Sequence, residues 1–182
     1  METQTKLVFL VVAFIVTLAL GGYLAVEFAG MLFSVTFIGG FIFWLLTTYR
    51  TPVNPDTIIV PYLITLACFI IHVYEEYVSH IERTLSTMSG TEVTQHNFLT
   101  IAAFIGPIVW LSGATMLITR WSFGYFLLGT FLFGMMIGEL SHFVFPFMED
   151  GRFHYSAGMY TAILPIGSAW WMFTKMKKGS KS

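Results

Sequence analysis

Residues 72–80 read HVYEEYVSH, and they bring four acidic or histidine side chains to the end of an apolar run that contains none. Successive residues of a helix are turned by about 100°, so these four side chains and Ser79 share an arc of roughly 140°. Glu76 stands one turn from both His72 and His80, and the three side chains can converge on one cation or share protons. The stretch therefore predicts a helix with one titratable face inside an otherwise apolar segment.

The composition predicts an integral membrane protein. Of the 182 residues, 56% are hydrophobic and only 10% are charged, whereas a soluble domain carries about 25% charged residues. The mean hydropathy is +0.76. A formal net charge of −1 argues against a nucleic-acid partner. We expect a single all-α domain, a polytopic bundle of transmembrane helices embedded in the lipid bilayer.

Loops and turn residues divide the apolar sequence into six predicted spans. Residues 7–49 as one helix would be about 65 Å long, twice the thickness of the hydrocarbon core, so we expect a tight turn at residues 27–30. Pro107 predicts a kink near mid-membrane, and residues 80–96 a surface loop or a short interfacial helix. The predicted spans are about residues 7–26, 31–49, 57–79, 97–119, 121–147 and 157–173.

The basic residues predict the orientation of these spans. An even number places both termini on one side, together with Lys6, Arg50, Arg120 and the four lysines near the C-terminus, whereas only Arg83 and Arg152 fall on the other side. The positive-inside rule then puts both termini in the cytoplasm. Spans one, three and five all end at the outer leaflet, which gathers their polar residues there: Glu27, His72, Glu75, Glu76, His80, Glu139 and His142.

Each of these residues also has a simpler interpretation. Glu27 fits an interfacial turn, and His80 fits an exposed position as well as a functional one. His154 is either a loop residue or part of the site, because it lies close in sequence to the rim. A buried hydrogen-bonded network that only holds helices together would explain the remaining histidines and glutamates.

The spacing favours metal binding over bare acid–base chemistry. Glu139-x-x-His142 is the i, i+3 pair that carboxylate-bridged di-metal bundles use, and His72 with Glu76 supplies a second one-turn pair in reverse order. These four residues are the predicted ligands of one or two divalent ions, and zinc, iron and manganese all suit such nitrogen and oxygen donors. Glu75 is predicted to orient a ligand or to act as a general base.

Other cofactor chemistry has no support in the sequence. There is no nucleotide-binding glycine motif and no serine-hydrolase elbow, so we expect no nucleotide cofactor. Every lysine lies near an end of the chain, outside the apolar spans, which excludes a retinal Schiff base.

The motif His72-x-x-Glu75-Glu76 in a small polytopic chain resembles the HXXEE-domain family of bacterial membrane proteins. The downstream histidine of that family resembles His142, and its Tyr-x-Pro-Gly element resembles residues 155–158, where Ala157 replaces the proline. The resemblance covers about residues 57–173. It implies a bacterial or archaeal cell-membrane protein with an active or metal site at these residues, Tyr155 included, and it implies no substrate. His154 is a further candidate catalytic residue only because it lies next to them in the sequence.

Three functions follow as hypotheses. The first is a membrane enzyme with a His/Glu-ligated divalent metal near the outer leaflet, acting on a lipid-like or membrane-delivered molecule by hydrolysis, isomerisation or oxidation. The second is a metal-free acid–base lipid isomerase. The third is a transporter or ion-binding protein, which the apolar sequence below the cluster in spans three and five disfavours. The oligomeric state is not encoded in any motif of the chain.

Overall fold

The computed structural model describes the backbone of residues 2–149 and 151–179, and the side chains of residues 5–20, 35–148 and 151–178. Within this part of the chain all regular structure is helical, which confirms the predicted all-α class. The elements in chain order are α1 (Glu2–Leu46), α2 (Pro55–Val78), α3 (Ile81–Ser89), α4 (Gln95–Phe98), the π-helix η1 (Leu99–Ile105), α5 (Gly106–Ile118), α6 (Ser122–Ile137), the 3₁₀-helix η2 (Gly138–Phe143), α7 (Phe145–Glu149) and α8 (Ile163–Gly179).

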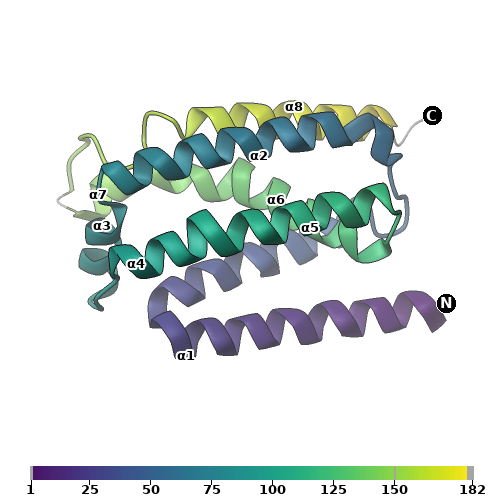
Figure 1. The fold of residues 1–182 in the computed structure, drawn as a ribbon, viewed down its shortest axis with the longest axis horizontal. Coiled ribbons are helices and arrows are strands. Elements are labelled where there is room, and N and C mark those ends of the chain that lie inside the picture. Colours follow the sequence, from purple (N-terminus) through teal and green to yellow (C-terminus); the bar gives the residue numbers. More distant parts are fainter. Residues whose placement is uncertain (1, 150, 180–182) are drawn as a thin grey trace.

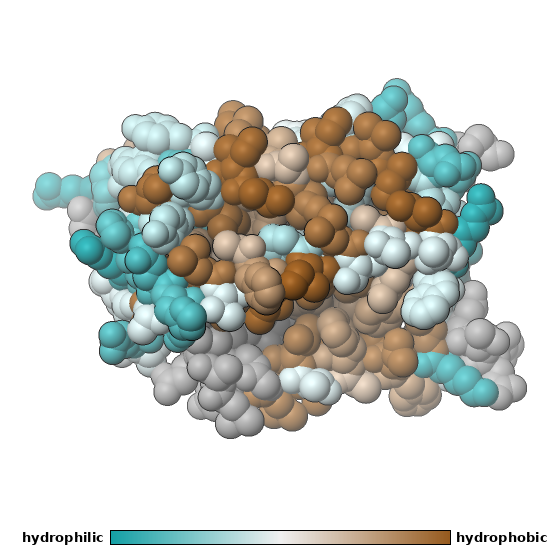
Figure 2. All heavy atoms as spheres, in the orientation of Figure 1, coloured by the Kyte–Doolittle hydropathy of each residue, from teal (hydrophilic) through white to brown (hydrophobic). Residues whose placement is uncertain are grey.

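Three helical stretches are long and apolar enough to cross a membrane. They are α2, the continuous run Gln95–Ile118 formed by α4, η1 and α5, and the run Ser122–Phe143 formed by α6 and η2. Hydrophobic side chains cover the middle of the face seen in Figure 2, and hydrophilic ones gather at its two ends. These findings are consistent with the expected helical membrane protein, whereas a count of six spans and the side of the termini go beyond them.

Helix α1 folds back on itself. The rings of Phe14 and Phe37 lie 5.7 Å apart, centroid to centroid, although a straight helix would separate these residues by about 35 Å. Figure 1 shows the two arms of α1 running in opposite directions. The chain therefore reverses between Phe14 and Phe37, a range that includes the turn expected at residues 27–30, and the side chain of Glu27 lies outside the described residues.

Helix α6 forms the centre of the bundle. In the run Ser122–Phe143, 72% of the residues in the most apolar window are buried. The second arm of α1 packs against it so closely that a Cβ atom at Gly40 would lie 2.3 Å from the backbone of Thr130. Because α6 is enclosed on several sides, polar residues at its end must face other protein groups.

Two of the predicted boundaries are wrong, for identifiable reasons. The span expected over residues 121–147 is interrupted, because α6 tightens into η2 at Gly138 and the chain turns at Val144 before α7. The span expected from residue 157 begins at Ile163, because residues 157–162 form turns in which Gly158 has φ +83°, outside the helical range.

Two further local predictions concern residues 80–96 and the helix around Pro107. The polar segment 80–96 contains the short helix α3, one of the two predicted alternatives. The π-helix η1 ends two residues before Pro107, where a kink was expected, and its i→i+5 pattern continues in the bond from the Gly106 N–H to the Ile101 carbonyl. Figure 1 shows α3 and α7 at one end of the bundle and the start of α1 and the end of α8 at the other.

Candidate metal centre

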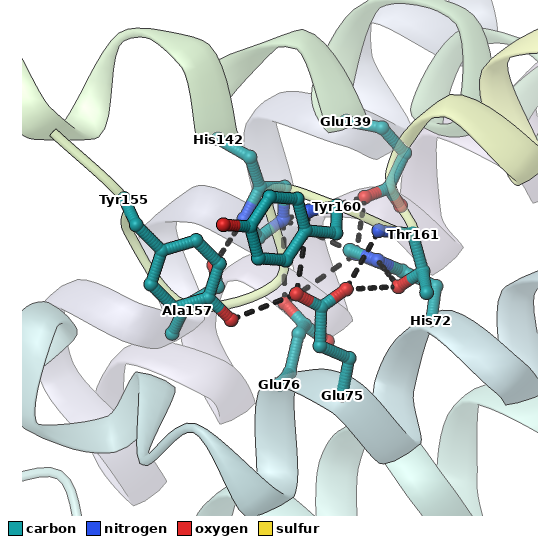
Figure 3. Close-up of polar contacts among 9 residues, drawn as sticks. All are labelled: His72, Glu75, Glu76, Glu139, His142, Tyr155, Ala157, Tyr160 and Thr161. Atoms are coloured by element: carbon teal, nitrogen blue, oxygen red, sulfur yellow. Dashed lines mark hydrogen bonds and ion pairs between the residues drawn. The ribbon is translucent and has the colours of Figure 1, made fainter. Parts of the chain in front are cut away.

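Four of the predicted site residues meet between α2 and η2. His72 and Glu76 lie one turn apart near the end of α2, and Glu139 and His142 lie in η2. In a 3₁₀-helix the side chains at i and i+3 eclipse each other, so the tightening of the chain at Gly138 points Glu139 and His142 to the same side. Figure 3 shows these four side chains directed toward one another from their two elements.

The donor atoms converge on one small volume. The Nε2 atoms of His72 and His142 are 3.2 Å apart. The Oε1 atom of Glu76 lies 3.4 Å from Nε2 of His142 and 3.7 Å from Nε2 of His72. Tetrahedral coordination with bonds of about 2.0–2.2 Å separates neighbouring ligand atoms by roughly 3.3–3.6 Å. These three side chains therefore have the spacing of ligands to a single metal ion.

Glu139 adds a fourth donor atom, the second oxygen of the cluster. Its Oε2 atom lies 2.8 Å from Nε2 of His72 and 3.4 Å from Nε2 of His142. Glu139 is buried, with 8% of its surface exposed, so its carboxylate depends on these partners in place of water. It contacts both imidazoles and is a candidate fourth ligand beside His72, Glu76 and His142, the three side chains whose ligand atoms all lie within 4.8 Å of one another.

Each imidazole is held through its other nitrogen. Nδ1 of His142 lies 2.7 Å from the carbonyl oxygen of Ala157 and donates to it. Nδ1 of His72 lies 3.1 Å from Oγ1 of Thr161, whose hydroxyl donates in turn to Oε2 of Glu75 at 2.5 Å. Because the single proton of Thr161 goes to the carboxylate, its oxygen is left to accept from His72. Both rings are thus assigned as Nδ1–H tautomers with the Nε2 lone pair free, as metal-ligating histidines require.

With this tautomer assignment, the gap between the two Nε2 atoms can take one added proton or a metal ion. Two neutral imidazoles with lone pairs facing each other across 3.2 Å repel, and two protonated Nε2 atoms would place both hydrogens in the same gap. A proton shared with a carboxylate, or a metal ion, removes the conflict. The paired carboxylates of Glu76 and Glu139 supply the compensating negative charge.

Glu75 has different partners from Glu76. Its Oε2 accepts from the backbone N–H and the hydroxyl of Thr161, and its Oε1 accepts from the hydroxyl of Tyr155 and the N–H of Tyr160. Four donors leave this carboxylate saturated. Its position fits a group that fixes Thr161, and through it the ring of His72.

The turn before α8 encloses the cluster. Gly158 has φ +83°, and a Cβ atom there would lie 2.7 Å from Cε1 of His142 and 2.9 Å from Cγ of Glu76. Only glycine fits this position without displacing both side chains. Ala157 stands where the resemblance implies proline, and the group that it contributes is its backbone carbonyl.

Tyr155 lies at the rim of the site. Its hydroxyl donates to Oε1 of Glu75 at 2.8 Å and lies 2.8 Å from Oγ of Ser79, and its ring stacks on Tyr160 with centroids 4.6 Å apart. Burial, with a contribution from the Glu75 carboxylate, raises the pKa of Tyr155 above its ordinary value. The phenol therefore stays protonated and keeps its role as a donor at neutral pH.

Two predicted histidines are placed differently. His80 does not join Glu76 as the helical phase suggested, because α2 ends at Val78 and His80 adopts a left-handed conformation with φ 61°. Its Nδ1 lies 3.0 Å from Oε1 of Glu82 instead. His154 lies in the loop before the site, with Nδ1 3.1 Å from the Arg152 carbonyl. The sequence interpretation missed Thr161 and the Ala157 carbonyl.

An apolar cavity of about 380 Å³ opens onto the cluster. Glu76, Glu139 and His142 form the titratable part of its wall. The rest of its wall is mostly apolar and comes from α1 to α7 and η1, with residues such as Phe69, Leu85, Phe98, Ile101, Trp110 and Met135. The cavity falls in the size range of pockets for small organic ligands.

The chain matches no known family model, and no curated protein or solved structure shows significant similarity to it. The resemblance to HXXEE-domain proteins therefore rests on the motif residues alone, and the function has to be argued from the site.

Proposed function

We propose that this protein is an integral membrane enzyme that uses a divalent metal, held by His72, Glu76, Glu139 and His142, to transform a lipid-like substrate. The observation that carries the proposal is the pair of imidazoles anchored through Nδ1, with Nε2 atoms 3.2 Å apart and the Glu76 carboxylate within 3.7 Å of both. The resemblance to the HXXEE-domain family, taken as a further proposal, places a site at the same residues.

The geometry favours one ion over two. A di-metal carboxylate centre needs additional bridging carboxylates, and Glu75, the nearest candidate, is saturated by the donors of Tyr155, Tyr160 and Thr161. Two nitrogen and two oxygen donors suit zinc, iron or manganese. When bound, such an ion polarises a carbonyl or phosphoryl oxygen and lowers the pKa of a water molecule.

The roles of the two adjacent glutamates follow from their partners. Glu76 faces both imidazoles and is the proposed ligand, whereas Glu75 positions His72 through Thr161. Of the two roles expected for Glu75, its saturated carboxylate supports orientation over proton abstraction. Tyr155 supports Glu75 from the rim and is proposed to act through it, since its hydroxyl donates to that carboxylate.

The cavity supports the lipid-like class of substrate. An apolar chain in this space of about 380 Å³ would place its polar end beside Glu76, Glu139 and His142. Hydrophobic walls bind such a chain by removing its surface from water, and the few polar groups fix the reacting end.

We also propose the six-span arrangement with cytoplasmic termini. The two arms of α1 and the helix α8 are additional crossing segments in this arrangement, which Figure 1 allows because the segments alternate between two ends of the bundle. The asymmetry of seven basic residues against two supports the cytoplasmic side.

One contact favours a second function. The distance of 2.8 Å between Nε2 of His72 and Oε2 of Glu139 is that of an ordinary hydrogen bond, so a proton can occupy the position of the metal. In that case the same four residues would exchange protons with the substrate, and the protein would be a metal-free lipid isomerase.

A comparison of membrane lipids tests the proposal. Membranes of cells expressing the wild-type chain and the His142→Asn variant are extracted, and the lipids are compared by mass spectrometry. We expect a lipid species that changes only with the wild-type chain when the lipids are separated by chromatography before mass measurement. Addition of water or oxygen changes the mass of the lipid, whereas isomerisation changes only its retention. Exposed His96→Asn is the matched control. Identical lipid profiles for wild type and His142→Asn, at equal expression and in the presence of metal, would contradict an enzymatic role on membrane lipids.

A further inference from the structure

A second cavity lies away from the His/Glu cluster. Its volume is about 610 Å³, and its walls come from the α1–α2 connection, the α5–α6 connection, the start of α6 and Leu7 of the first arm of α1. Both connections lie at the end of the bundle where α1 begins and α8 ends, opposite α3 and α7 (Figure 1). None of its lining residues belongs to the cluster or to the apolar cavity beside it.

This cavity is positively charged. Arg50 and Arg120, from the two different connections, both line it, and no aspartate or glutamate does. Among the residues that the structure describes, neither arginine forms an ion pair with a carboxylate. Two guanidinium groups without a counter-ion create a positive potential, which a cleft with low-dielectric walls concentrates.

Further polar groups are available in the same cavity. Thr48 lines it and is 4% exposed, yet its Oγ1 atom has no hydrogen-bond partner among the described residues. A buried hydroxyl without a partner is unfavourable, so a ligand oxygen that reaches Thr48 would be stabilised. Arg120 occupies a left-handed position with φ 60°, where glycine is the usual residue after a helix, so the arginine is kept at that position despite backbone strain.

The cavity also has an apolar side. Leu7, Trp44, Pro52 and Val53 lie among the lining residues, and Trp44 and Val53 are almost fully buried. An amphiphile could therefore place a charged group against the arginines and the start of a hydrocarbon chain against these side chains.

We propose that this cavity binds an anionic phosphate group, carried by a phospholipid head group or present as free phosphate. The planar fork of arginine matches phosphate oxygens and donates two hydrogen bonds to them. Basic pockets between transmembrane helices are suited to anionic lipid head groups. The site is separate from the proposed metal centre and needs no metal.

Native mass spectrometry of the purified full-length protein tests the proposal. The probes are phosphatidylglycerol and phosphatidylcholine with identical acyl chains. We expect the wild type to retain phosphatidylglycerol about tenfold more strongly, because the quaternary ammonium of phosphatidylcholine offsets the phosphate charge and is repelled by the two arginines. The Arg50→Gln/Arg120→Gln variant should lose this preference. Lys175→Gln/Lys178→Gln, the same charge change on exposed residues at the end of α8, should keep it.

The outcomes separate the two sources of phosphate. If millimolar inorganic phosphate raises the melting temperature of the wild type and displaces the lipid, the ligand is free phosphate; if it does neither while phosphatidylglycerol stabilises the protein, the ligand is a lipid. Equal losses in the arginine and lysine variants, or no loss in the arginine variant, overturn the proposal. Should the arginine variant not fold, Thr48→Val decides, since it keeps both charges: we expect a several-fold weaker lipid adduct, and an unchanged adduct overturns the site.

Discussion

The imidazole rings of His72 and His142 meet through their Nε2 atoms at 3.2 Å, with the two ring planes at 85° to each other. The two residues come from helices that are 70 positions apart in the sequence. Each ring is anchored on its far side, His72 by Thr161 and His142 by the carbonyl of Ala157. Such an arrangement leaves two nitrogen lone pairs directed at one point.

The adjacent glutamates should behave differently when each is changed to glutamine. Glu76→Gln removes a proposed ligand and should lose the metal and its stabilising effect. Glu75→Gln removes only a group that positions His72, so it should keep the fold and weaken metal affinity by about 10–100-fold, with loss of turnover. Glu92→Gln, on an exposed loop residue, is the control. Calorimetric titration with zinc measures both effects, and metal-replete Glu76→Gln beside metal-free Glu75→Gln would show that the roles are inverted.

Thr161 should matter through its hydroxyl and not through its shape. Thr161→Val removes the acceptor for Nδ1 of His72 and the donor to Glu75, and we expect about 10–100-fold weaker zinc binding. Thr161→Ser keeps both hydrogen bonds and should bind zinc like the wild type. Equal affinities for the valine and serine variants would remove Thr161 from the account.

Gly158→Ala should disturb the site, because the turn at residue 158 has no room for a Cβ atom and its backbone conformation favours glycine. The left-handed conformation costs a residue with a Cβ about 1–2 kcal/mol, and the clash with His142 and Glu76 adds about 1–3 kcal/mol. We expect a lower melting temperature and a reduced metal content. Gly167→Ala in α8 is the matched control, because a Cβ there meets nothing within 4 Å and should stabilise the helix by about 0.5–1 kcal/mol. A Gly158→Ala variant as stable and as metal-rich as wild type is incompatible with the described turn.

The proposed topology places Glu92 and Lys178 on opposite sides of the membrane. Glu92 follows α3, and Lys178 lies in the last turn of α8, at the other end of the bundle in Figure 1. Single cysteines at these positions, in a chain whose Cys68 is replaced by serine, should react with an impermeant maleimide in intact cells at position 92 only. Reaction at both positions, or at position 178 alone, would contradict cytoplasmic termini.

The four candidate ligands were easier to predict from the sequence than the helix ends and the supporting groups around them. All four residues that the structure brings together were predicted from their spacing. His72 and Glu76 lie one turn apart, and Glu139 and His142 lie three residues apart. Those pairs could be recognised because helical periodicity links sequence positions to a common face. The same periodicity failed for His80, because it holds only as far as the helix continues, and α2 ends at Val78.

The supporting groups could not be predicted in the same way. Ala157 contributes a backbone carbonyl, which every residue has, so no side-chain pattern marks it. Thr161 was assigned to the interior of a span, whereas it lies in the turn before α8 and reaches Glu75 across a separation of 86 residues. Contacts of that kind depend on how the turn packs against α2, which local sequence does not encode. The resemblance did mark residues 155–158, and at Gly158 a Cβ atom would meet both His142 and Glu76 of the cluster.

Elemental analysis of the purified full-length protein tests the central claim most directly. The protein is expressed with added zinc, iron and manganese and is purified in detergent without chelators. We predict about one divalent ion per chain in the wild type and in the loop variant His154→Asn, and almost none in His72→Asn or His142→Asn. A metal content near zero in the folded wild type, or the same content in His142→Asn as in wild type, would contradict the account and favour the metal-free acid–base function.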